Sequence, residues 1–128
     1  MGEVLYRGKA LALYNQVMLI DAEDIDAYPQ WSTGIENAIL GPKGVAVSAL
    51  GDTQVEIIIY KGNTVVESTL YISGEIEIGK SGLIVGNEIA GTSERIPWPS
   101  GKAKIKVYAN GPQNTATQII FVLDTLTD

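Results

Sequence analysis

The chain has 128 residues (13.7 kDa) and carries 15 Asp and Glu against 9 Lys and Arg, so its net charge is −6 and its pI is near 4.5. It contains neither cysteine nor histidine. Disulfides, cysteine nucleophiles, Ser-His-Asp triads and Cys/His metal sites are therefore excluded. The length predicts a single domain over residues 1–128, and the negative charge disfavours direct contact with nucleic acid.

The composition favours β-structure in a water-soluble protein. Hydrophobic residues make up 45% of the chain, and Ile, Val and Thr together account for 35 of the 128 residues, which suits pleated strands better than helices. The longest apolar run, Ile119 to Leu123, is far shorter than the ~20 residues that span a bilayer. No secretory signal is visible at the start. We expect a cytoplasmic protein without a membrane partner.

In chain order, residues 3–7 are predicted as a short strand, and residues 11–20 as a covered strand with apolar side chains on both faces. Four carboxylates follow within residues 21–26. Thr33 and Glu36 have the spacing of a capping box, and Gly41 with Pro42 is a typical stop signal. The sequence therefore predicts one short helix near residues 33–40.

From Gly44 onward the pattern is that of strands. Residues 45–50, 54–60 and 64–72 are predicted as a three-stranded meander, with the pairs Gly51-Asp52 and Gly62-Asn63 as hairpin turns. Residues 75–78 alternate strictly, which predicts a half-buried strand with its glutamates in water. Residues 83–89 form a further apolar run.

The last part of the chain alternates as well. Lys102, Lys104 and Lys106 share one face of a predicted strand, and we expect them to lie across from Glu75 and Glu77. Residues 117–124 form a last, mostly apolar strand. The sequence thus predicts an all-β fold, an antiparallel β-sandwich of about eight strands with one short helix; a barrel is the alternative.

The acidic run is the most suggestive cluster. It is interpreted as a contact patch for a basic partner, as a calcium site or as a solvated loop. The EF-hand pattern fails, because its sixth position is Asp26 rather than Gly and its twelfth is Ser32 rather than Glu. We expect no metal and no cofactor. Trp31 and Trp98 are each interpreted as packing residues first and interface residues second.

Gly74 to Ser81 matches the phosphate-loop spacing letter for letter. A phosphate loop is followed by a helix, whose N-terminus binds the anion. Here the four residues between the glycines alternate as a strand, and another predicted strand follows. The match is therefore interpreted as chance.

Four motifs resemble one known family. Tyr14-Asn15-Gln16 opens an apolar strand, Gln30-Trp31-Ser32 precedes a stretch that ends at Gly41, Gly44 to Ser48 follows, and Trp98-Pro99-Ser100-Gly101 leads into a strand. Over residues 10–126 the chain is similar to the competence protein J family of nuclease inhibitors. Gln30 and Ser32 replace the Asp and Thr of the family pattern. The resemblance implies a sandwich that binds a nuclease and blocks it.

The sequence thus predicts a non-catalytic binding protein, a nuclease inhibitor or immunity-type protein that acts through an acidic surface on a basic nuclease. The predicted contact residues are Asp21, Glu23, Asp24, Asp26 and Trp31. The alternative is a structural or assembly subunit that self-associates. A carboxylate-based hydrolase is a third hypothesis, disfavoured because the chain has no histidine.

Overall fold

The computed structural model describes residues 3–12, 15–23, 37–51, 53–62, 66–87, 92–111 and 115–125. Strands occupy most of these segments. They are β1 (Glu3–Leu11), β2 (Gln16–Asp21), β3 (Ala38–Gly41), β4 (Gly44–Ser48), β5 (Gln54–Lys61), β6 (Thr69–Ile78), β7 (Leu83–Asn87), β8 (Thr92–Ile96), β9 (Gly101–Ala109) and β10 (Gln118–Thr125). None of the described residues belongs to a helix long and apolar enough to cross a membrane.

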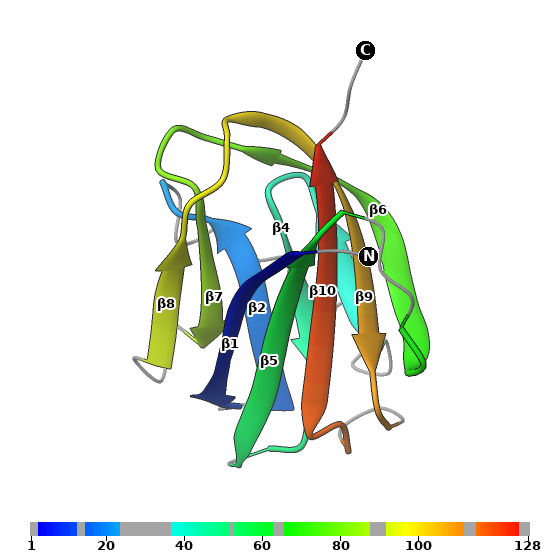
Figure 1. Ribbon diagram of the computed structural model, residues 1–128. Coiled ribbons are helices and arrows are strands. Elements are labelled where there is room, and N and C mark those ends of the chain that lie inside the picture. The colour runs from blue at the N-terminus through cyan, green and yellow to red at the C-terminus, as the bar shows by residue number, and fades with distance from the viewer. Residues whose placement is uncertain are drawn as a thin grey trace.

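The strands form two five-stranded sheets that pack face to face (Figure 1). Sheet A has the order β1-β5-β10-β9-β6, and sheet B has the order β3-β4-β2-β7-β8. The predicted all-β sandwich is confirmed, with ten strands rather than about eight.

The purely antiparallel arrangement predicted from the sequence is wrong at one place. β5 and β10 pair in parallel, with Glu56 opposite Gln118 and Lys61 opposite Leu123. The other strand pairs are antiparallel. Parallel neighbours need a long crossover connection, and here the chain between them makes four further strands in both sheets.

The predicted meander over residues 45–72 is also wrong. β4 lies in sheet B, whereas β5 lies in sheet A between β1 and β10, and β6 pairs with β9 at the far edge of that sheet. The segment around Gly51 therefore joins strands of different sheets, and the segment that begins at Gly62 crosses sheet A instead of forming a hairpin. Gly62 has a φ of 88°, a left-handed conformation that a glycine adopts without strain.

Two local predictions need correction. Ala38 to Gly41 form β3, which pairs with β4, so the second half of the predicted helix near residues 33–40 is a strand, and residues 33–36 lie outside the described part. The predicted strand over residues 11–20 is divided, because β1 ends at Leu11 and β2 begins at Gln16. Asn15, with a φ of 60°, lies in the connection between them.

The core lies between the sheets, and strict alternation in several strands builds it. In β9, Ala103, Ile105 and Val107 are buried while the intervening lysines are exposed. Glu75 and Glu77 are exposed as predicted, and they lie opposite Lys104 and Lys102 in the register of β6 and β9. The largest core side chains, all less than 2% exposed, include Phe121, Leu19, Ile57, Ile59, Ile76, Leu83, Ile105, Ile119 and Leu123.

Smaller apolar clusters lie on the outer faces of both sheets. Ile58, Ile120 and Val122 form one on sheet A, with Val66 packed against it. Met18, Ile20, Ala22, Ala46 and Ile84 form the other on sheet B. β2 and β10 are therefore buried on both faces, which explains their nearly continuous apolar sequences.

The sandwich has two distinct ends. The turn end, at the top of Figure 1, carries the connections β3–β4, β6–β7 and β8–β9; the loop end, at the bottom, carries β1–β2, β4–β5 and β9–β10. Trp98, in the β8–β9 connection, is buried, as predicted, and the Lys61 ammonium lies 5.7 Å from the centre of its ring.

Candidate functional site

The structure describes two of the five predicted contact residues, and both lie at the turn end. Asp21 is the last residue of β2, and only 3% of it is exposed. Its Oδ1 accepts the backbone N–H groups of Glu23 at 3.1 Å and of Gly79 at 3.3 Å. The Asp21 side chain therefore points into the protein, where it joins the end of β2 to the β6–β7 turn.

Glu23 is exposed and bonds to the same turn. Its Oε2 accepts the backbone N–H of Lys80 at 3.2 Å. Gly79 and Lys80 belong to the segment that matches the phosphate-loop spacing, and their amides are thus bound by carboxylates of the chain itself. The segment lies in β6 and the turn before β7, which confirms that the match is not a phosphate loop.

The remaining predicted contact residues, Asp24, Asp26 and Trp31, lie outside the described residues. In the part of the chain that the structure describes, no three or more Asp and Glu side chains come close enough to hold a metal ion.

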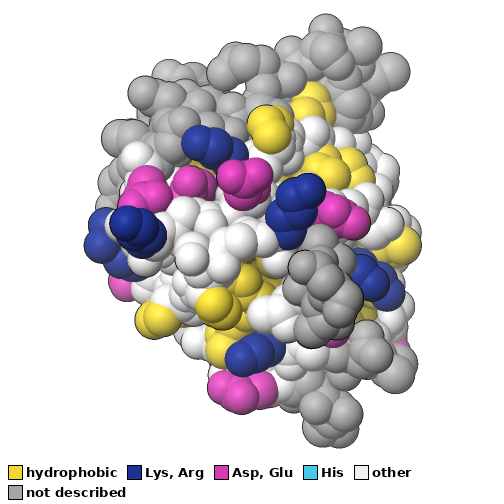
Figure 2. Space-filling view, turned by 90° about the horizontal axis from the view of Figure 1, so that it is seen from above, with side chains coloured by type: hydrophobic (Ala, Val, Ile, Leu, Met, Phe, Trp, Pro, Cys, Tyr) yellow, Lys and Arg dark blue, Asp and Glu magenta, His cyan; other side chains and the backbone are white. Residues whose placement is uncertain are grey.

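The net charge of the chain is carried by residues outside the described segments. All nine Lys and Arg residues and nine of the fifteen acidic residues lie in the described segments, so this part of the chain is neutral. The net charge of −6 is carried by six acidic residues outside it: Asp24, Asp26, Glu36, Asp52, Glu88 and Asp128. Seen from above the turn end, the described side chains show Lys and Arg interspersed with Asp and Glu (Figure 2).

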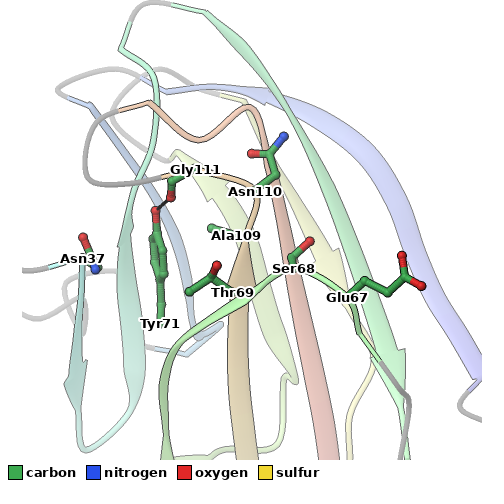
Figure 3. Close-up of a pocket in the computed structure, with 8 residues that line it drawn as sticks. All are labelled: Asn37, Glu67, Ser68, Thr69, Tyr71, Ala109, Asn110 and Gly111. Carbon is green, nitrogen blue, oxygen red and sulfur yellow. Dashed lines mark hydrogen bonds between the residues drawn. The ribbon is translucent and has the colours of Figure 1, made fainter.

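A hollow of about 690 Å³ lies at the loop end, beside the start of β6 and the end of β9 (Figure 3). Six of its eight described lining residues have polar side chains, and Glu67 is the one charged residue among them. The lining residues are Asn37, Glu67, Ser68, Thr69, Tyr71, Ala109, Asn110 and Gly111.

Tyr71 is one of the residues that line this hollow. Its hydroxyl donates a hydrogen bond to the backbone carbonyl of Gly111. Burial raises the pKa of the Tyr71 hydroxyl, so the phenol keeps the proton that it donates at neutral pH.

Hydrogen bonds hold the loops around the hollow in place. The Asn110 side chain accepts the backbone N–H groups of Thr117 at 2.9 Å and Gln118 at 3.1 Å, and donates to the Thr117 hydroxyl at 3.0 Å. Leu50 N–H donates to the Ala116 carbonyl at 2.8 Å, which joins the β4–β5 loop to the β9–β10 loop.

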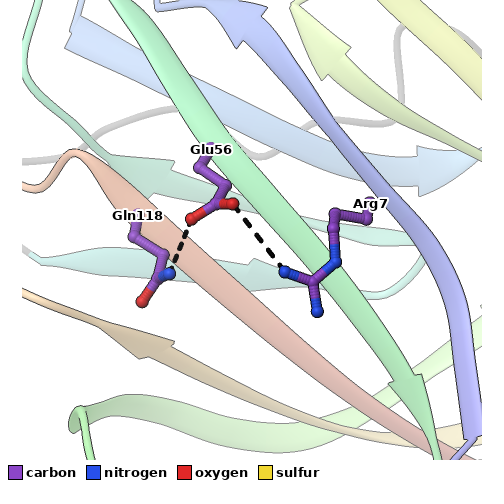
Figure 4. Close-up of polar contacts among 3 residues, drawn as sticks. All are labelled: Arg7, Glu56 and Gln118. Atoms are coloured by element: carbon purple, nitrogen blue, oxygen red, sulfur yellow. Dashed lines mark hydrogen bonds and ion pairs between the residues drawn. The ribbon is translucent and has the colours of Figure 1, made fainter.

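Glu56, on the outer face of sheet A next to the loop end, contacts two side chains of neighbouring strands. Glu56 accepts a hydrogen bond from Gln118 Nε2 at 2.7 Å through Oε1, and its Oε2 lies 3.9 Å from Arg7 Nη1 (Figure 4). Lys9 is the register partner of Glu56 on β1. Arg7 of the neighbouring strand is thus the described ion-pair partner of this glutamate.

Sequence reasoning missed the loop-end hollow. Its residues are mostly common polar types from three separate segments of the chain, and they form no motif. The closeness of Asn110 and Gly111 to Tyr71 depends on the pairing of β6 with β9.

Comparisons with known proteins bear on the fold. No protein-family model matches the chain, and no curated protein matches its sequence. The crystal structure of ComJ, inhibitor of the DNA degrading activity of NucA, from Bacillus subtilis, is similar with a TM-score of 0.74 and 11% identity, covering 98% of this chain and 99% of that one. A structure described as crocagin biosynthetic gene J is similar with a TM-score of 0.55 and 8% identity, covering 99% of both chains.

At these identities the similarity concerns the fold. It extends over nearly the whole of each chain, and it agrees with the resemblance that the sequence motifs indicate. The chain thus has the fold of the nuclease inhibitor ComJ.

Proposed function

We propose that this protein binds a DNA-degrading nuclease and inhibits it, with no catalytic activity of its own. The observation that carries the proposal is the full-length structural similarity to ComJ, an inhibitor of NucA. Fold similarity at 11% identity does not by itself transfer function, so the proposal also depends on the charge and chemistry of the chain.

The charge of the chain fits such a target. Nucleases bind a polyanion, and proteins that do so present Lys and Arg to the phosphates. An inhibitor with a net charge of −6 is attracted to that basic surface, and the attraction accelerates association at low salt. The lack of histidine removes the side chain that most often serves as a general base near neutral pH.

Within the acidic run, we assign contact with the nuclease to Asp24 and Asp26, with Trp31 as an apolar anchor. Asp21 is buried, and it and Glu23 bind backbone amides of the β6–β7 turn. These two carboxylates are assigned to the stability of the turn end.

The experiment measures DNA degradation by NucA from Bacillus subtilis with increasing amounts of the protein. Inhibition that saturates near one protein per nuclease, with an affinity that falls as salt rises, is the expected result. DNA degradation that is unchanged at a large excess of the protein would overturn the proposal.

The contact assignment is tested with the double variant Asp24→Asn/Asp26→Asn. Its matched control is Glu75→Gln/Glu77→Gln, which removes two exposed carboxylates from β6. The first pair is expected to slow association with NucA more than the control, and equal association rates would contradict the assignment. Light scattering tests the alternative function, a self-associating assembly subunit. The measured mass of such a subunit rises with protein concentration, whereas an inhibitor can stay a monomer at all concentrations.

A further inference from the structure

One asparagine of the chain is followed by glycine. Of the six asparagines, at positions 15, 37, 63, 87, 110 and 114, Asn110 alone has this neighbour, Gly111. The backbone nitrogen that follows an asparagine can attack the carbon of the side-chain amide, and glycine favours the attack because it has no Cβ and its backbone turns freely. The pair lies just after β9, at the start of the β9–β10 connection, and has the chemical prerequisite for deamidation.

Water reaches this pair. Asn110 is exposed, and both residues line the loop-end hollow (Figure 3). Deamidation needs water as the reagent that opens the cyclic intermediate, and it needs solvent hydroxide to take the proton of the attacking nitrogen. The position of the pair at the surface supplies both.

The Asn110 carboxamide is held at both of its polar atoms. Its Oδ1 accepts the backbone N–H groups of Thr117 at 2.9 Å and Gln118 at 3.1 Å, and its Nδ2 donates to the Thr117 hydroxyl at 3.0 Å. All three bonds bind the carboxamide to the start of β10. The carboxamide therefore has to leave these bonds before it turns to the nitrogen of Gly111.

Gly111 is held by a different strand. Its carbonyl accepts the hydroxyl of Tyr71, which lies on β6. The Asn110 N–H also donates to the Gln118 carbonyl at 3.3 Å, which fixes the backbone on the other side of the reacting bond. The attacked carbon and the attacking nitrogen are thus tied to separate strands, and closing a ring between them requires the β9–β10 connection to open.

The same bonds suit an aspartate at this position. A carboxylate accepts the two N–H groups as the amide oxygen does, and the Thr117 hydroxyl, which accepts a bond from Nδ2, turns and donates instead. Hydrogen bonds to an ionised acceptor are stronger than those to an amide. In isoaspartate the chain continues through the side-chain carboxyl, which adds a carbon to the backbone before Gly111 and displaces its carbonyl from Tyr71.

We propose that Asn110 is a site of spontaneous deamidation, that its bonds to Thr117 and Gln118 restrain the reaction in the folded protein, and that the fold accepts the aspartate product. The Gly111 nitrogen loses its proton to hydroxide and bonds to the amide carbon of Asn110, whose C–N bond breaks and releases ammonia. Water then adds to the succinimide ring and opens it to aspartate or isoaspartate. Each converted molecule gains one negative charge. The rate follows the fraction of molecules in which the β9–β10 connection is open.

The experiment follows the full-length protein by mass spectrometry at mildly alkaline pH, folded in buffer and unfolded in concentrated urea. Trypsin cleaves after Lys106 and leaves residues 107–128 as one peptide without further Lys or Arg, and its fragmentation distinguishes Asn110 from Asn114. Asn110 is expected to deamidate roughly tenfold or more slowly in the folded protein. Equal rates overturn the restraint, and an Asn110 that stays intact in urea overturns the site.

A matched pair of variants tests the hydrogen bonds. Thr117→Val removes the hydroxyl that binds Nδ2 and nearly keeps the size of the side chain, and Thr125→Val makes the same change at the other end of β10, where the threonine is also exposed. In the folded state Asn110 is expected to deamidate severalfold faster in Thr117→Val than in Thr125→Val, and in urea the two rates are expected to agree. Equal rates in the folded state contradict the restraint by this hydroxyl.

Thermal unfolding tests the fit of the product. Asn110→Asp is expected to keep the melting temperature of the unmodified protein, whereas Asn110→Ala loses all three side-chain bonds and is expected to melt lower. If Asn110→Asp melts as low as Asn110→Ala, the fold does not accept the aspartate. None of these measurements uses a nuclease, so their outcome is independent of the proposed function.

Discussion

The carboxylate of Asp21 accepts the backbone N–H of Gly79, 58 residues further along the chain, at 3.3 Å. The same oxygen accepts the N–H of Glu23 at 3.1 Å, so one buried carboxylate fixes both the end of β2 and the β6–β7 turn. Around it, Ala22 N–H donates to the Gly82 carbonyl at 2.9 Å, and Glu77 N–H donates to the Pro42 carbonyl at 2.8 Å. Three segments of the turn end are thus tied together around one side chain.

Replacement of Asp21 by alanine is expected to lower the free energy of unfolding by about 2 kcal/mol, because two amides lose a charged acceptor in a buried place. Asp21→Asn keeps one oxygen acceptor and is expected to cost less. Glu23→Ala, at an exposed position, is expected to change stability by no more than about 0.5–1 kcal/mol. Urea unfolding measures all three, and a Glu23 variant as unstable as the Asp21→Ala variant would contradict this role.

Position 82 favours glycine for two reasons, its backbone conformation and the lack of space for a side chain. Its φ is 80°, and a Cβ there would lie 2.5 Å from the backbone carbonyl oxygen of Ile96. Gly62 has a φ of 88° and open space where its Cβ would lie. We expect Gly62→Ala to cost about 1 kcal/mol from backbone strain alone. Gly82→Ala is expected to cost about 3 kcal/mol, because the added Cβ also collides with the Ile96 carbonyl. Thermal unfolding compares the two variants. Similar melting temperatures would mean that the backbone at Ile96 moves away from the added Cβ at little cost.

Two neighbouring residues of β10 allow the stability contributed by the core between the sheets to be compared with that of the outer apolar cluster on sheet A. Phe121 lies fully buried between the sheets, and Ile120 lies on the outer face of sheet A, where it is 8% exposed. Phe121→Ala is expected to cost about 3–5 kcal/mol and Ile120→Ala about 2 kcal/mol. Denaturant unfolding of both checks the ranking, and the reverse order would mean that the outer cluster contributes more than the core between the sheets.

The raised pKa values of two tyrosines predict that the free energy of unfolding falls at alkaline pH. Burial raises the pKa of Tyr6, to which the nearby Glu94 carboxylate adds, and burial also raises the pKa of Tyr71. In the unfolded chain both hydroxyls ionise near the ordinary value of about 10, before they do so in the folded protein. Their contribution is therefore complete below about pH 10 and is lost as the pH rises through the folded values.

The double variant Tyr6→Phe/Tyr71→Phe removes this contribution. The free energy of unfolding of the variant is expected to fall less steeply above about pH 10 than that of the unmodified protein. Urea titrations at a series of pH values measure both slopes. If the free energies of unfolding of the two proteins fall in parallel with pH, the loss of stability at alkaline pH comes from titratable groups other than these tyrosines.

Strict alternation made part of the fold predictable. In residues 102–106 of β9 and in the second half of β6, every second residue is a charged residue on the outer face, and a period of two fixes which face each side chain occupies. The lysine face of residues 102–106 was expected across from Glu75 and Glu77, and the register of β6 and β9 places Glu75 opposite Lys104 and Glu77 opposite Lys102. The class of fold followed from the same short alternating runs.

Strand partners were not predictable in this way. β5 is an interior strand of sheet A, and its neighbours β1 and β10 come from opposite ends of the described chain. Alternation reports which face is buried and contains nothing about which strand lies alongside. Gly51-Asp52 is typical of a hairpin turn, yet the strands before and after it belong to different sheets, because that choice depends on tertiary packing.

The helix predicted near residues 33–40 is wrong over residues 38–40, the part that forms a described strand, for a similar reason. Thr33 and Glu36 have capping-box spacing, but local propensity decides little when Ala38 to Gly41 hydrogen-bond to β4. In the candidate site, the run of carboxylates was visible in the sequence, whereas the burial of Asp21 was not, because it depends on a turn 58 residues away. The hollow beside Tyr71 gave no signal at all.

The position of β10 has a consequence for how the chain is synthesised. β10 lies in the middle of sheet A, between β5 and β9, and it is the last of the described strands to leave the ribosome. The pair β1–β5 and the pair β9–β6 have no shared neighbour until residues 118–125 emerge, whereas all five strands of sheet B precede residue 97. Sheet A can therefore be completed only when the final segment of the chain inserts between its two strand pairs.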